Sequence, residues 1–328
     1  MSKYKNKKTE DKFIDSFLRP DSWDEYIGQE KIKKNLNLIL KAAKKRKEAI
    51  DHLLFYGPTG LGKTTLATLV AKEMKANLRI TTGPAIQKVG ELAAILSSLE
   101  DKDILFIDEI HRLNRSIEEV LYPALDSHEL HLVIGKGLGS RMVSLNLPSF
   151  TLVAATTRPN LLSSPLRSRF GATFQFDYYL FNEIEIIIQR SADLMGIKIK
   201  PEAVSLLSRV CRFTPRIANR LLKRVRDFSE VNNLKIIDTK AVEQTLEFME
   251  IDCLGLEPCE RKLLETIIKK FNNQPVGINT LTAALSEEKG VIEEVYEPYL
   301  IKLGLLRRTS SGRVTTSEAR NHLKIFNK

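Results

Sequence analysis

Cysteine, histidine and tryptophan are scarce in this 328-residue sequence, which has three, five and one of them. The cysteines, Cys211, Cys253 and Cys259, are too few for a disulfide framework and lack the spacing of zinc ligands. His128 and His131 lie near each other, but no third ligand completes a metal set. A disulfide-stabilised secreted domain and a zinc-centred fold are therefore excluded, and we expect a reducing, cytoplasmic compartment.

Long apolar stretches are absent as well. No run of about 18 uncharged apolar residues occurs, so no membrane-spanning helix is predicted. The first residues, MSKYKNKKTEDKF, are polar and charged and lack the apolar core of a signal peptide. We predict that residues 1–17 form a flexible N-terminal tail.

Basic residues outnumber acidic ones. Lys and Arg total 51 against 41 Asp and Glu, which gives a formal net charge of +10. This balance favours a polyanionic partner, although charge alone says nothing about the fold. The hydrophobic content of 43% is sufficient for packed cores, so an intrinsically disordered chain is excluded. At roughly 100–200 residues per domain, the length predicts two or three domains.

Strands and helices alternate in the first half of the sequence. The apolar spacing predicts a helix from Trp23 to about Lys47, whose basic end, Lys41–Lys47, is expected to be a solvated face. Buried strands are predicted at 52–56, 104–107 and 150–155, with a helix at 63–74 after the first. This alternation indicates a parallel sheet with helices on both faces. Two alternating stretches within Leu130–Leu147 predict a projecting β-hairpin around Gly135–Gly139.

The second half has helical patterns only, until its end. Helices are predicted near 183–194, 201–212, 214–228 and 239–249, followed by a linker at 254–258. Further helices at 259–271, 278–285 and 291–303 precede two short strands around Ser310–Gly312. Three helices followed by a hairpin resemble a winged helix, a relative of the helix-turn-helix.

The strongest motif is the stretch GPTGLGKT at 57–64, which fits the P-loop pattern G-x-x-x-x-G-K-[ST] in full. Its glycines allow backbone N–H groups to converge on phosphate oxygens, and the following helix points its positive end at the same anion. Lys63 would reach the β- and γ-phosphates, and the Thr64 hydroxyl would ligate Mg²⁺. A chance match in a glycine turn is disfavoured, because a buried strand precedes the motif and a helix follows it.

Two further strand ends carry candidate catalytic groups. Asp108 and Glu109 follow a buried strand, where Asp108 can hold Mg²⁺ and Glu109 can orient and deprotonate the attacking water. Without the P-loop they would be an ordinary acidic pair at a strand end. Thr157, after the next strand, is positioned to bond the γ-phosphate or the water.

Phosphoryl transfer also needs positive charge beside the transition state. Arg169, just past a predicted helix in the stretch SPLRSRF, suits an arginine finger that reaches a neighbouring subunit's site. Arg216, in the first turn of a helix, could touch the γ-phosphate, or it could be a surface arginine of a basic stretch. Arg307, Arg308 and Arg313 surround the Ser-Ser-Gly turn, where a basic hairpin tip can lie on DNA phosphates or be a solvated turn. For Arg216 and for the three arginines around the turn, both interpretations stay open at this point.

The full set of motifs resembles that of AAA+ ATPases and, more narrowly, the bacterial RuvB family of Holliday-junction branch-migration motors. The resemblance extends from Leu18 to about Leu323. The stretches that carry it are DEYIGQ (24–29), LFIDEIHRLN (105–114), VIGKG (133–137), ATTR (155–158), SPLRSRFG (164–171), TPRIA (214–218), QPVG (274–277) and VYEPY (295–299).

The resemblance implies an α/β fold with three domains. These are an AAA+ P-loop domain over 18–178 with the hairpin insertion near 130–147, an α-helical lid domain over 179–253 and a winged-helix DNA-binding domain over 254–328. It also implies a hexameric ring that hydrolyses ATP with Mg²⁺ and pulls duplex DNA during recombination, repair and the SOS response. RuvA would dock on the hairpin near Ile134–Arg141, and a RuvC-type resolvase would belong to the wider complex.

Family roles transfer by position. Lys63 corresponds to the Walker A lysine, Asp108 and Glu109 to Walker B, Thr157 to sensor 1, Arg169 to the arginine finger and Arg216 to sensor 2, and these six are the implied catalytic residues. The implied metal ligands are Thr64 and Asp108, and the implied DNA contacts are Arg308 and Arg313. The implied nucleotide contacts are Leu18, Arg19, Gly57, Gly60, Leu61, Gly62, Lys63, Thr64, Thr65, Asp126, Ser127, His128, Arg169, Tyr179 and Arg216.

Three departures from the family pattern occur, and none removes a catalytic group. Thr59 replaces the usual second proline of the P-loop. The triplet Asp126-Ser127-His128 replaces Glu-Asp-Phe at the implied contact with a neighbouring subunit's nucleotide. Ser310-Ser311 replaces a proline-containing turn before Gly312.

Two other functions remain as alternatives. A clamp-loader or helicase-loader type AAA+ protein would bind ATP to open a partner ring and would lack the hairpin and the winged helix. A nucleotide-gated DNA-binding switch would bind ATP without productive turnover, and Glu109 and Arg169 argue against it because they serve hydrolysis.

Overall fold

The computed structural model describes residues 17–134 and 141–326. Two compact units are found, one with the residues up to Glu183 together with Thr214–Arg216, the other with Ile184–Phe213 and the residues from Ile217 onward. The predicted N-terminal tail and the tip of the predicted hairpin lie outside the described residues, apart from Phe17. Within the described ranges, no helix is both long and apolar enough to cross a membrane. The division into three domains stays a prediction.

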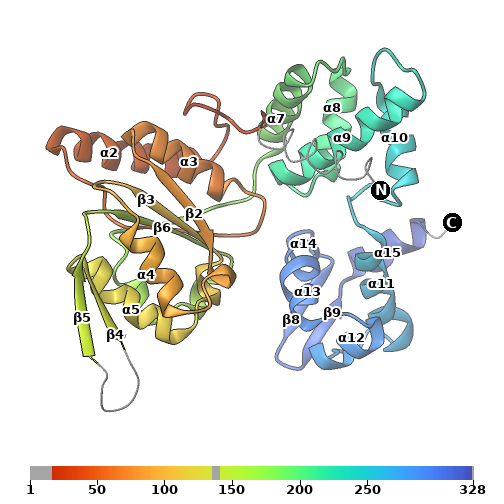
Figure 1. The fold of residues 1–328 in the computed structure, drawn as a ribbon. Coiled ribbons are helices and arrows are strands. Elements are labelled where there is room, and N and C mark those ends of the chain that lie inside the picture. The colour runs from red at the N-terminus through yellow and green to blue at the C-terminus, as the bar shows by residue number, and fades with distance from the viewer. Residues whose placement is uncertain (1–16, 135–140, 327–328) are drawn as a thin grey trace, which may run out of the picture. The chain divides into compact units, whose positions relative to one another are not determined.

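The first unit is built on a five-stranded parallel sheet with the strand order β2-β3-β6-β1-β7 (Figure 1). Its strands are β1 (Leu53–Tyr56), β2 (Leu78–Thr82), β3 (Ile104–Asp108), β6 (Thr151–Thr156) and β7 (Ala172–Gln175). The three strands predicted from buried apolar runs are confirmed as β1, β3 and β6. The edge strands β2 and β7 were missed, because only one of their nine residues is buried and they lack an apolar run.

Helices cover both faces of this sheet, as predicted, with α2 and α3 on one side and α4 and α5 on the other (Figure 1). The helices of this unit are α2 (Glu30–Arg46), α3 (Lys63–Met74), α4 (Val89–Ser97), α5 (Arg115–Asp126) and α6 (Ser164–Arg167), with short 3₁₀ turns η1 (Gly83–Ala85), η2 (Ile110–Arg112) and η4 (Pro159–Leu161). The predicted helix start at Trp23 is wrong. Gly28 and Gln29 both have positive φ angles, of 77° and 55°, so the helix begins only at Glu30.

The hairpin predicted at 130–147 is present. Strands β4 (Glu129–Ile134) and β5 (Arg141–Asn146) pair antiparallel, with Leu130 opposite Leu145. Leu130 is buried in the core under α5, whereas Met142 is 73% exposed. The hairpin is therefore anchored at its base and presents apolar surface toward its far end.

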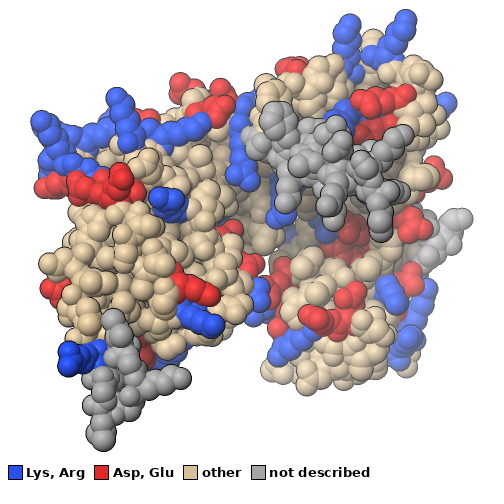
Figure 2. All heavy atoms as spheres, in the orientation of Figure 1, with Lys and Arg blue, Asp and Glu red and all other residues tan. Residues whose placement is uncertain are grey.

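Basic side chains gather along α2 on the face seen in Figure 2. The helix ends in Lys44, Lys45 and Arg46, and residues 44–47 are all exposed. Lys44 pairs with Glu73 and Arg46 with Glu48. The interpretation of Lys41–Lys47 as a solvated face agrees with this exposure.

The described residues of the second unit form helices and one hairpin, with an isolated parallel bridge between Ile199 and Ile237 (Figure 1). Its elements are α7 (Phe181–Leu194), α8 (Pro201–Val210), α9 (Pro215–Val231), α10 (Thr239–Phe248), α11 (Pro258–Glu265), α12 (Ile278–Leu285), α13 (Lys289–Val291), α14 (Glu297–Lys302), β8 (Leu306–Thr309), β9 (Gly312–Thr315) and α15 (Ser317–Phe326). Two predicted helices contain π-helical segments, η5 (Thr266–Lys270) and η6 (Ile292–Tyr296), and α15 was not predicted. One core, with Leu263, Leu281 and Leu300 at its centre, supports the winged-helix elements.

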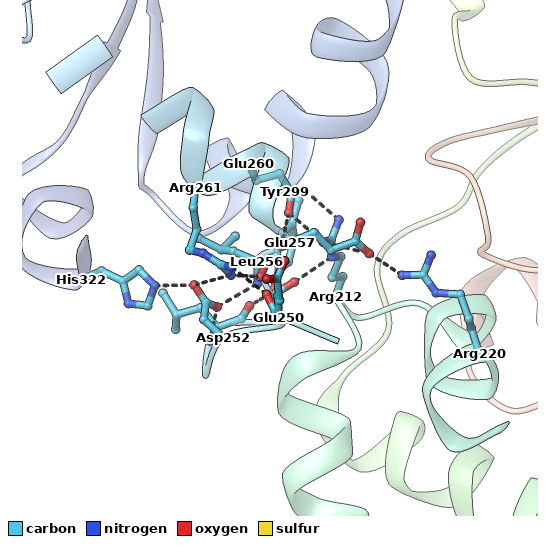
Figure 3. A network of polar contacts seen from close by, with 12 residues as sticks. Arg212, Arg220, Glu250, Asp252, Leu256, Glu257, Glu260, Arg261, Tyr299 and His322 are labelled. Carbon is cyan, nitrogen blue, oxygen red and sulfur yellow. Dashed lines mark hydrogen bonds and ion pairs between the residues drawn. The ribbon is translucent and has the colours of Figure 1, made fainter. Parts of the chain in front are cut away.

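A buried polar network joins the α8–α9 connection to the winged-helix elements (Figure 3). Arg212 donates to both carboxylate oxygens of Glu260 at 2.7 Å and to the carbonyl of Gly255 at 3.0 Å. Nearby, the buried Asp252 accepts from the ring of His322 at 2.7 Å. These contacts link segments far apart in the sequence, so the four-helix part and the winged helix share one packed unit.

Candidate nucleotide site and nucleic-acid interface

The phosphate-binding loop runs from the end of β1 to the start of α3. Gly57, Gly60 and Gly62 have φ angles of 139°, 80° and 94°. A Cβ at Gly57 would lie 2.5 Å from the carbonyl oxygen of Phe176, and one at Gly62 would lie 2.7 Å from the Tyr26 hydroxyl. Only glycine fits both the backbone angles and the space, so the loop can present its N–H groups to an anion.

Lys63 lies inside this loop. It is the first residue of α3, it is buried, and its Nζ donates to the carbonyl oxygens of Gly57 and Pro58 at 2.7 Å each. Burial lowers the pKa of Lys63 to about 8, against the opposing effect of the Asp108 carboxylate. The ammonium is therefore poorly solvated, and a phosphate beside it would stabilise its charge.

Because β3 and β6 run parallel to β1, their carboxyl ends lie on the same side of the sheet as this loop. The N–H of Gly57 donates to the carbonyl of Thr156 at 3.2 Å, which ties the loop to the end of β6. Thr157 is the next residue and is half-buried. Asp108 ends β3, the other neighbour of β6. The structure thus places Lys63, Asp108 and Thr157 at one edge of the sheet, as the sequence predicted.

Glu109 follows Asp108 in a left-handed conformation, with a φ of 49°. Its N–H donates to Asp108 Oδ1 at 2.9 Å, and its carboxylate pairs with Arg112 Nη1 at 3.2 Å. The side chains of Glu109 and Arg112 are each about half exposed, and a solvent-accessible pair of this kind is weak. The Glu109 carboxylate can therefore leave Arg112 and turn to an incoming water.

The donor set at this edge fits Mg²⁺. Thr64 follows Lys63 on α3 and supplies a hydroxyl, and Asp108 supplies a carboxylate. Mg²⁺ prefers oxygen ligands and is usually held by one or two protein groups, with phosphate oxygens and waters completing the octahedron. Thr64 and Asp108 are such a pair.

Two buried tyrosines lie beneath the loop. The Tyr179 hydroxyl donates to the carbonyl of Leu61 at 3.3 Å, and the Tyr26 hydroxyl approaches the same oxygen at 3.5 Å. Burial raises the pKa of Tyr179 to about 12, so this hydroxyl stays protonated as a donor. Of the first two implied nucleotide contacts, Leu18 is buried and Arg19 is exposed.

Arg216 lies beside the P-loop in the first unit. It is in the first turn of α9, and a Cβ at Gly60 would lie 3.0 Å from the Arg216 Cβ. Two nearby arginines, four positions before and after it, form ion pairs: Arg212 with Glu260 and Arg220 with Glu257. Arg216 is exposed and adjoins the loop, so it is accessible to a bound nucleotide, and its nucleotide role stays a prediction.

Arg169 follows α6 and is held by three contacts from its own chain. Its Nε and Nη2 donate to Asp126 Oδ2 at 2.9 and 2.6 Å, and its Nη1 donates to the Pro165 carbonyl at 2.6 Å. The guanidinium also lies over the Tyr122 ring, 4.5 Å from its centroid. Asp126 therefore has a contact that the sequence did not predict, since it accepts from the candidate arginine finger.

The side chains of Ser127 and His128 also contact residues of their own chain. The Ser127 hydroxyl donates to the Pro123 carbonyl at 3.0 Å. The His128 ring packs against Phe150 at a centroid distance of 6.0 Å, and its Nδ1 is buried without a hydrogen-bond partner among the described residues. The histidine thus occupies a partly apolar environment, where the family pattern has phenylalanine.

Arg308 and Arg313 lie directly opposite each other on β8 and β9. Both pair with the buried carboxylate of Glu297, and Arg313 also pairs with Glu293. The Arg308 side chain is 50% exposed, whereas that of Arg313 is only 13% exposed. The structure brings the two arginines together as predicted, but the side chain of Arg308 is much more accessible to solvent than that of Arg313.

Comparison with known proteins agrees with these observations along most of the chain. Residues 18–176 match the family model described as the Holliday junction DNA helicase RuvB P-loop domain. Residues 179–252 match the RuvB AAA lid domain, and 253–324 match the RuvB C-terminal winged helix domain.

The chain belongs to the RuvB family.

Curated relatives and solved structures support this assignment. The RuvB subunit of the Holliday junction branch migration complex from Fusobacterium nucleatum is 52% identical over 311 residues, which is 95% of this chain and 94% of that protein. The corresponding Clostridium kluyveri protein is 53% identical, over 95% of this chain and 88% of its own length. The Thermotoga maritima RuvB branch migration motor matches with a TM-score of 0.86 and 49% identity, over 94% of this chain and 98% of that one. As a RuvB family member, the chain is a P-loop ATPase of the AAA+ class with a lid and a winged helix.

Sequence reasoning missed several groups around this RuvB site. Tyr26 stands within the quoted stretch DEYIGQ, yet only the structure shows its hydroxyl beneath Gly62. The His111 ring, three residues after Asp108, bonds the buried Thr156 hydroxyl at 3.0 Å. Tyr122, which supports Arg169, had no signal of its own, because an aromatic residue in a helix usually indicates packing alone.

Proposed function

We propose that this chain hydrolyses ATP at the junctions between subunits of a hexameric ring and uses the cycle to drive branch migration of Holliday junctions. The observation that carries the proposal is the convergence of Lys63, Asp108 and Thr157 on one sheet edge in a chain that also has a winged helix. The names of the relatives, branch migration complex subunit and branch migration motor, support the same reaction.

ATP binding would begin with its phosphates in the P-loop. The inward N–H groups between Gly57 and Thr65 would bind phosphate oxygens, and Lys63 would exchange its two carbonyl partners for the β- and γ-phosphates. The base would lie near Leu18 and Tyr179. Thr64 and Asp108 would hold Mg²⁺, which would neutralise part of the phosphate charge.

Hydrolysis would need a water in line with the γ-phosphate. Glu109 would leave Arg112, orient that water and accept its proton. Thr157, beside the loop, would fix the water or a γ-oxygen. Arg216 of the same chain and Arg169 of the next subunit would then stabilise the charge that develops on the transferred group.

Translocation would use the winged helix and the hairpin. The wing, which carries Arg308 and Arg313, would contact the backbone of duplex DNA without reading its bases. RuvA would bind the hairpin near Ile134–Arg141 and direct the ring to a junction, with a RuvC-type resolvase acting on the product. The clamp-loader alternative is less well supported, because the projecting hairpin and the winged helix are both present.

The test is a branch-migration assay on a synthetic four-way junction, with and without RuvA, alongside ATP turnover. The unmodified protein should dissociate the junction in an ATP-dependent and RuvA-stimulated manner. Lys63→Ala and Arg169→Ala should each abolish DNA-stimulated turnover. Turnover that survives in both variants, or turnover without any junction migration, would exclude the proposed motor.

A further inference from the structure

In the wing, which is the hairpin of β8 and β9, two arginines share one buried carboxylate, and the sequence alone does not reveal this arrangement. Arg308 and Arg313 lie directly opposite each other across β8 and β9, and like charges in this position destabilise a two-stranded hairpin. The Glu297 carboxylate, which begins α14, lies between them and is fully buried. A buried carboxylate is tolerated only when it is paired and hydrogen-bonded, so each partner needs the other.

The contacts of Glu297 link its carboxylate to both arginines. Oε2 accepts from Arg308 Nε and pairs with Arg308 Nη2, both at 2.5 Å. Oε1 accepts from Arg313 Nε at 2.8 Å. Arg313 Nη2 donates to Glu293 Oε1 at 2.9 Å and, over a longer distance of 3.5 Å, to Glu297 Oε2. Among the described residues, Glu297 therefore holds both guanidiniums, whereas Glu293 is bonded to Arg313.

Arg313 is a poor candidate for a direct phosphate contact. Its guanidinium is engaged by two carboxylates, and its side chain is 13% exposed. Its backbone is fixed as well, because its N–H and carbonyl bond Val276 on the side away from β8. Arg313 thus acts as a structural brace that ties β9 to Glu293, Glu297 and Val276.

Arg308 is different. Its side chain is 50% exposed, and the contacts to Glu297 use only the Nε–Nη2 edge of the guanidinium. A guanidinium has five N–H donors in a rigid fork, so the opposite side of Arg308 can still donate to a phosphate. With its inner edge held by Glu297, the side chain loses less rotamer freedom when it binds.

We propose that Glu297 is a positioning residue for the DNA contact of the wing, which orients Arg308 toward a phosphate of the duplex backbone and uses Arg313 as a brace. This inference rests on the proposed DNA-binding function of the wing. It goes beyond that function because it assigns the two arginines unequal roles and adds a buried acid to a phosphate-binding surface.

The experiment measures binding of the full-length protein to a fluorescein-labelled duplex of random sequence, by anisotropy, at several salt concentrations and with a non-hydrolysable ATP analogue. The variants are Glu297→Gln, Glu293→Gln, Arg308→Ala and the double variant Glu297→Gln/Arg308→Ala. Glu293→Gln is the matched control, because it removes the same charge one turn away and frees only Arg313. Thermal melting and ATP turnover without DNA establish that each variant is folded.

Positioning and simple electrostatics predict opposite results for Glu297→Gln. Removing a negative charge beside two arginines should tighten DNA binding if charge alone matters. If Glu297 orients Arg308, binding should instead weaken about tenfold, on the scale of one charge-assisted hydrogen bond. Arg308→Ala should weaken binding to a similar degree and reduce the slope of log Kd against log salt, as Glu297→Gln should. Glu293→Gln should stay within about twofold, since the contact it removes belongs to the brace.

The double variant decides whether Glu297 acts through Arg308. Binding by the double variant no weaker than that of Arg308→Ala would support the proposal. Unchanged or tighter binding by Glu297→Gln, or additive losses in the double variant, would overturn it and leave the DNA-binding function intact. If Arg308→Ala itself binds the duplex normally, the proposed DNA contact of the wing fails, and the positioning role fails with it.

Discussion

Arg212 and Glu260 form a bidentate ion pair in the interior of the second unit, with both N···O distances at 2.7 Å. Arg212 has a positive φ of 57° at the end of α8, and Glu260 lies in the first turn of α11. The Tyr299 ring stacks near the guanidinium, 5.2 Å from its carbon. The pair joins the helices before it to the winged helix after it, so the packing of both depends on it (Figure 3).

Breaking this pair should destabilise the protein strongly. Arg212→Met or Glu260→Gln leaves the other group buried without its partner, and we expect a loss of about 3–5 kcal/mol in the free energy of unfolding. Arg212→Met/Glu260→Leu should recover much of that loss, because neither position then carries a buried charge without its partner. Urea denaturation measures each value. The exposed pair of Lys72 and Asp21 is the control, and Lys72→Ala should cost at most about 1 kcal/mol.

ATP binding should take up a proton near pH 8. Burial lowers the pKa of Lys63 to about 8, so part of the nucleotide-free protein has a neutral lysine there. Phosphates favour the ammonium, so they raise this pKa, and affinity should fall as the pH rises from 7 to 9. Calorimetry at pH 8 in two buffers of different ionisation enthalpy counts the protons. Lys63→Arg should abolish the uptake, because a guanidinium stays charged in this range. Equal uptake by that variant would assign the proton to another group.

Gly57→Ala should damage the fold as well as the site. The φ of 139° and a Cβ position 2.5 Å from the Phe176 carbonyl leave no room for a side chain. The backbone strain alone is worth roughly 1–3 kcal/mol, and ATP binding should be lost with it. Gly90→Ala is the matched control: Gly90 lies in α4, and a Cβ there has no atom within 4 Å. That variant should be neutral or more stable by up to about 1 kcal/mol in thermal or urea unfolding.

Asp126→Asn should lower ATP turnover with little effect on ATP affinity. Asp126 accepts two N–H groups of Arg169, and the neutral amide would hold the guanidinium less firmly. We expect kcat to fall about fivefold to tenfold, with KM within about twofold, since the residue acts through the arginine. Steady-state kinetics with duplex DNA provide both values. A large rise in KM at constant kcat would instead assign Asp126 a direct contact with the neighbouring nucleotide.

Met142→Asp should impair the response to RuvA. Met142 lies near the free end of the hairpin with 73% of its surface exposed, and an apolar side chain there suits a protein partner. A charge at this position should abolish most RuvA stimulation of branch migration and leave turnover without RuvA unchanged. Leu38→Asp is the control, since Leu38 is similarly exposed on α2, away from the hairpin. Full RuvA stimulation of the Met142 variant would move the docking surface elsewhere.

The elements that could be predicted are those with a strong local signal. The helix 63–74 and the helix 278–285 have the predicted bounds, and each has a glycine directly before its first residue. The first follows the P-loop motif, and the second has an apolar period of its own. The edge strand β2 could not be found in this way, since its side chains are half-exposed or exposed and its order comes from pairing with β3. The early part of the helix predicted from Trp23 failed because two residues with positive φ delay the start of α2.

By itself, the sequence determined the chemistry of the nucleotide site. The spacing of Gly57, Gly62 and Lys63 specifies a phosphate loop, because local backbone geometry suffices to build it. Only the tertiary structure decided which carboxylate each arginine meets. The sequence offered Arg212 as part of a basic stretch, Arg169 as a candidate arginine finger and Arg308 as a candidate DNA contact. In the structure, they pair with Glu260, Asp126 and Glu297, respectively. These partners lie 11 to 48 positions away along the chain, and an ion pair depends on distance in space, which composition and local periodicity do not contain.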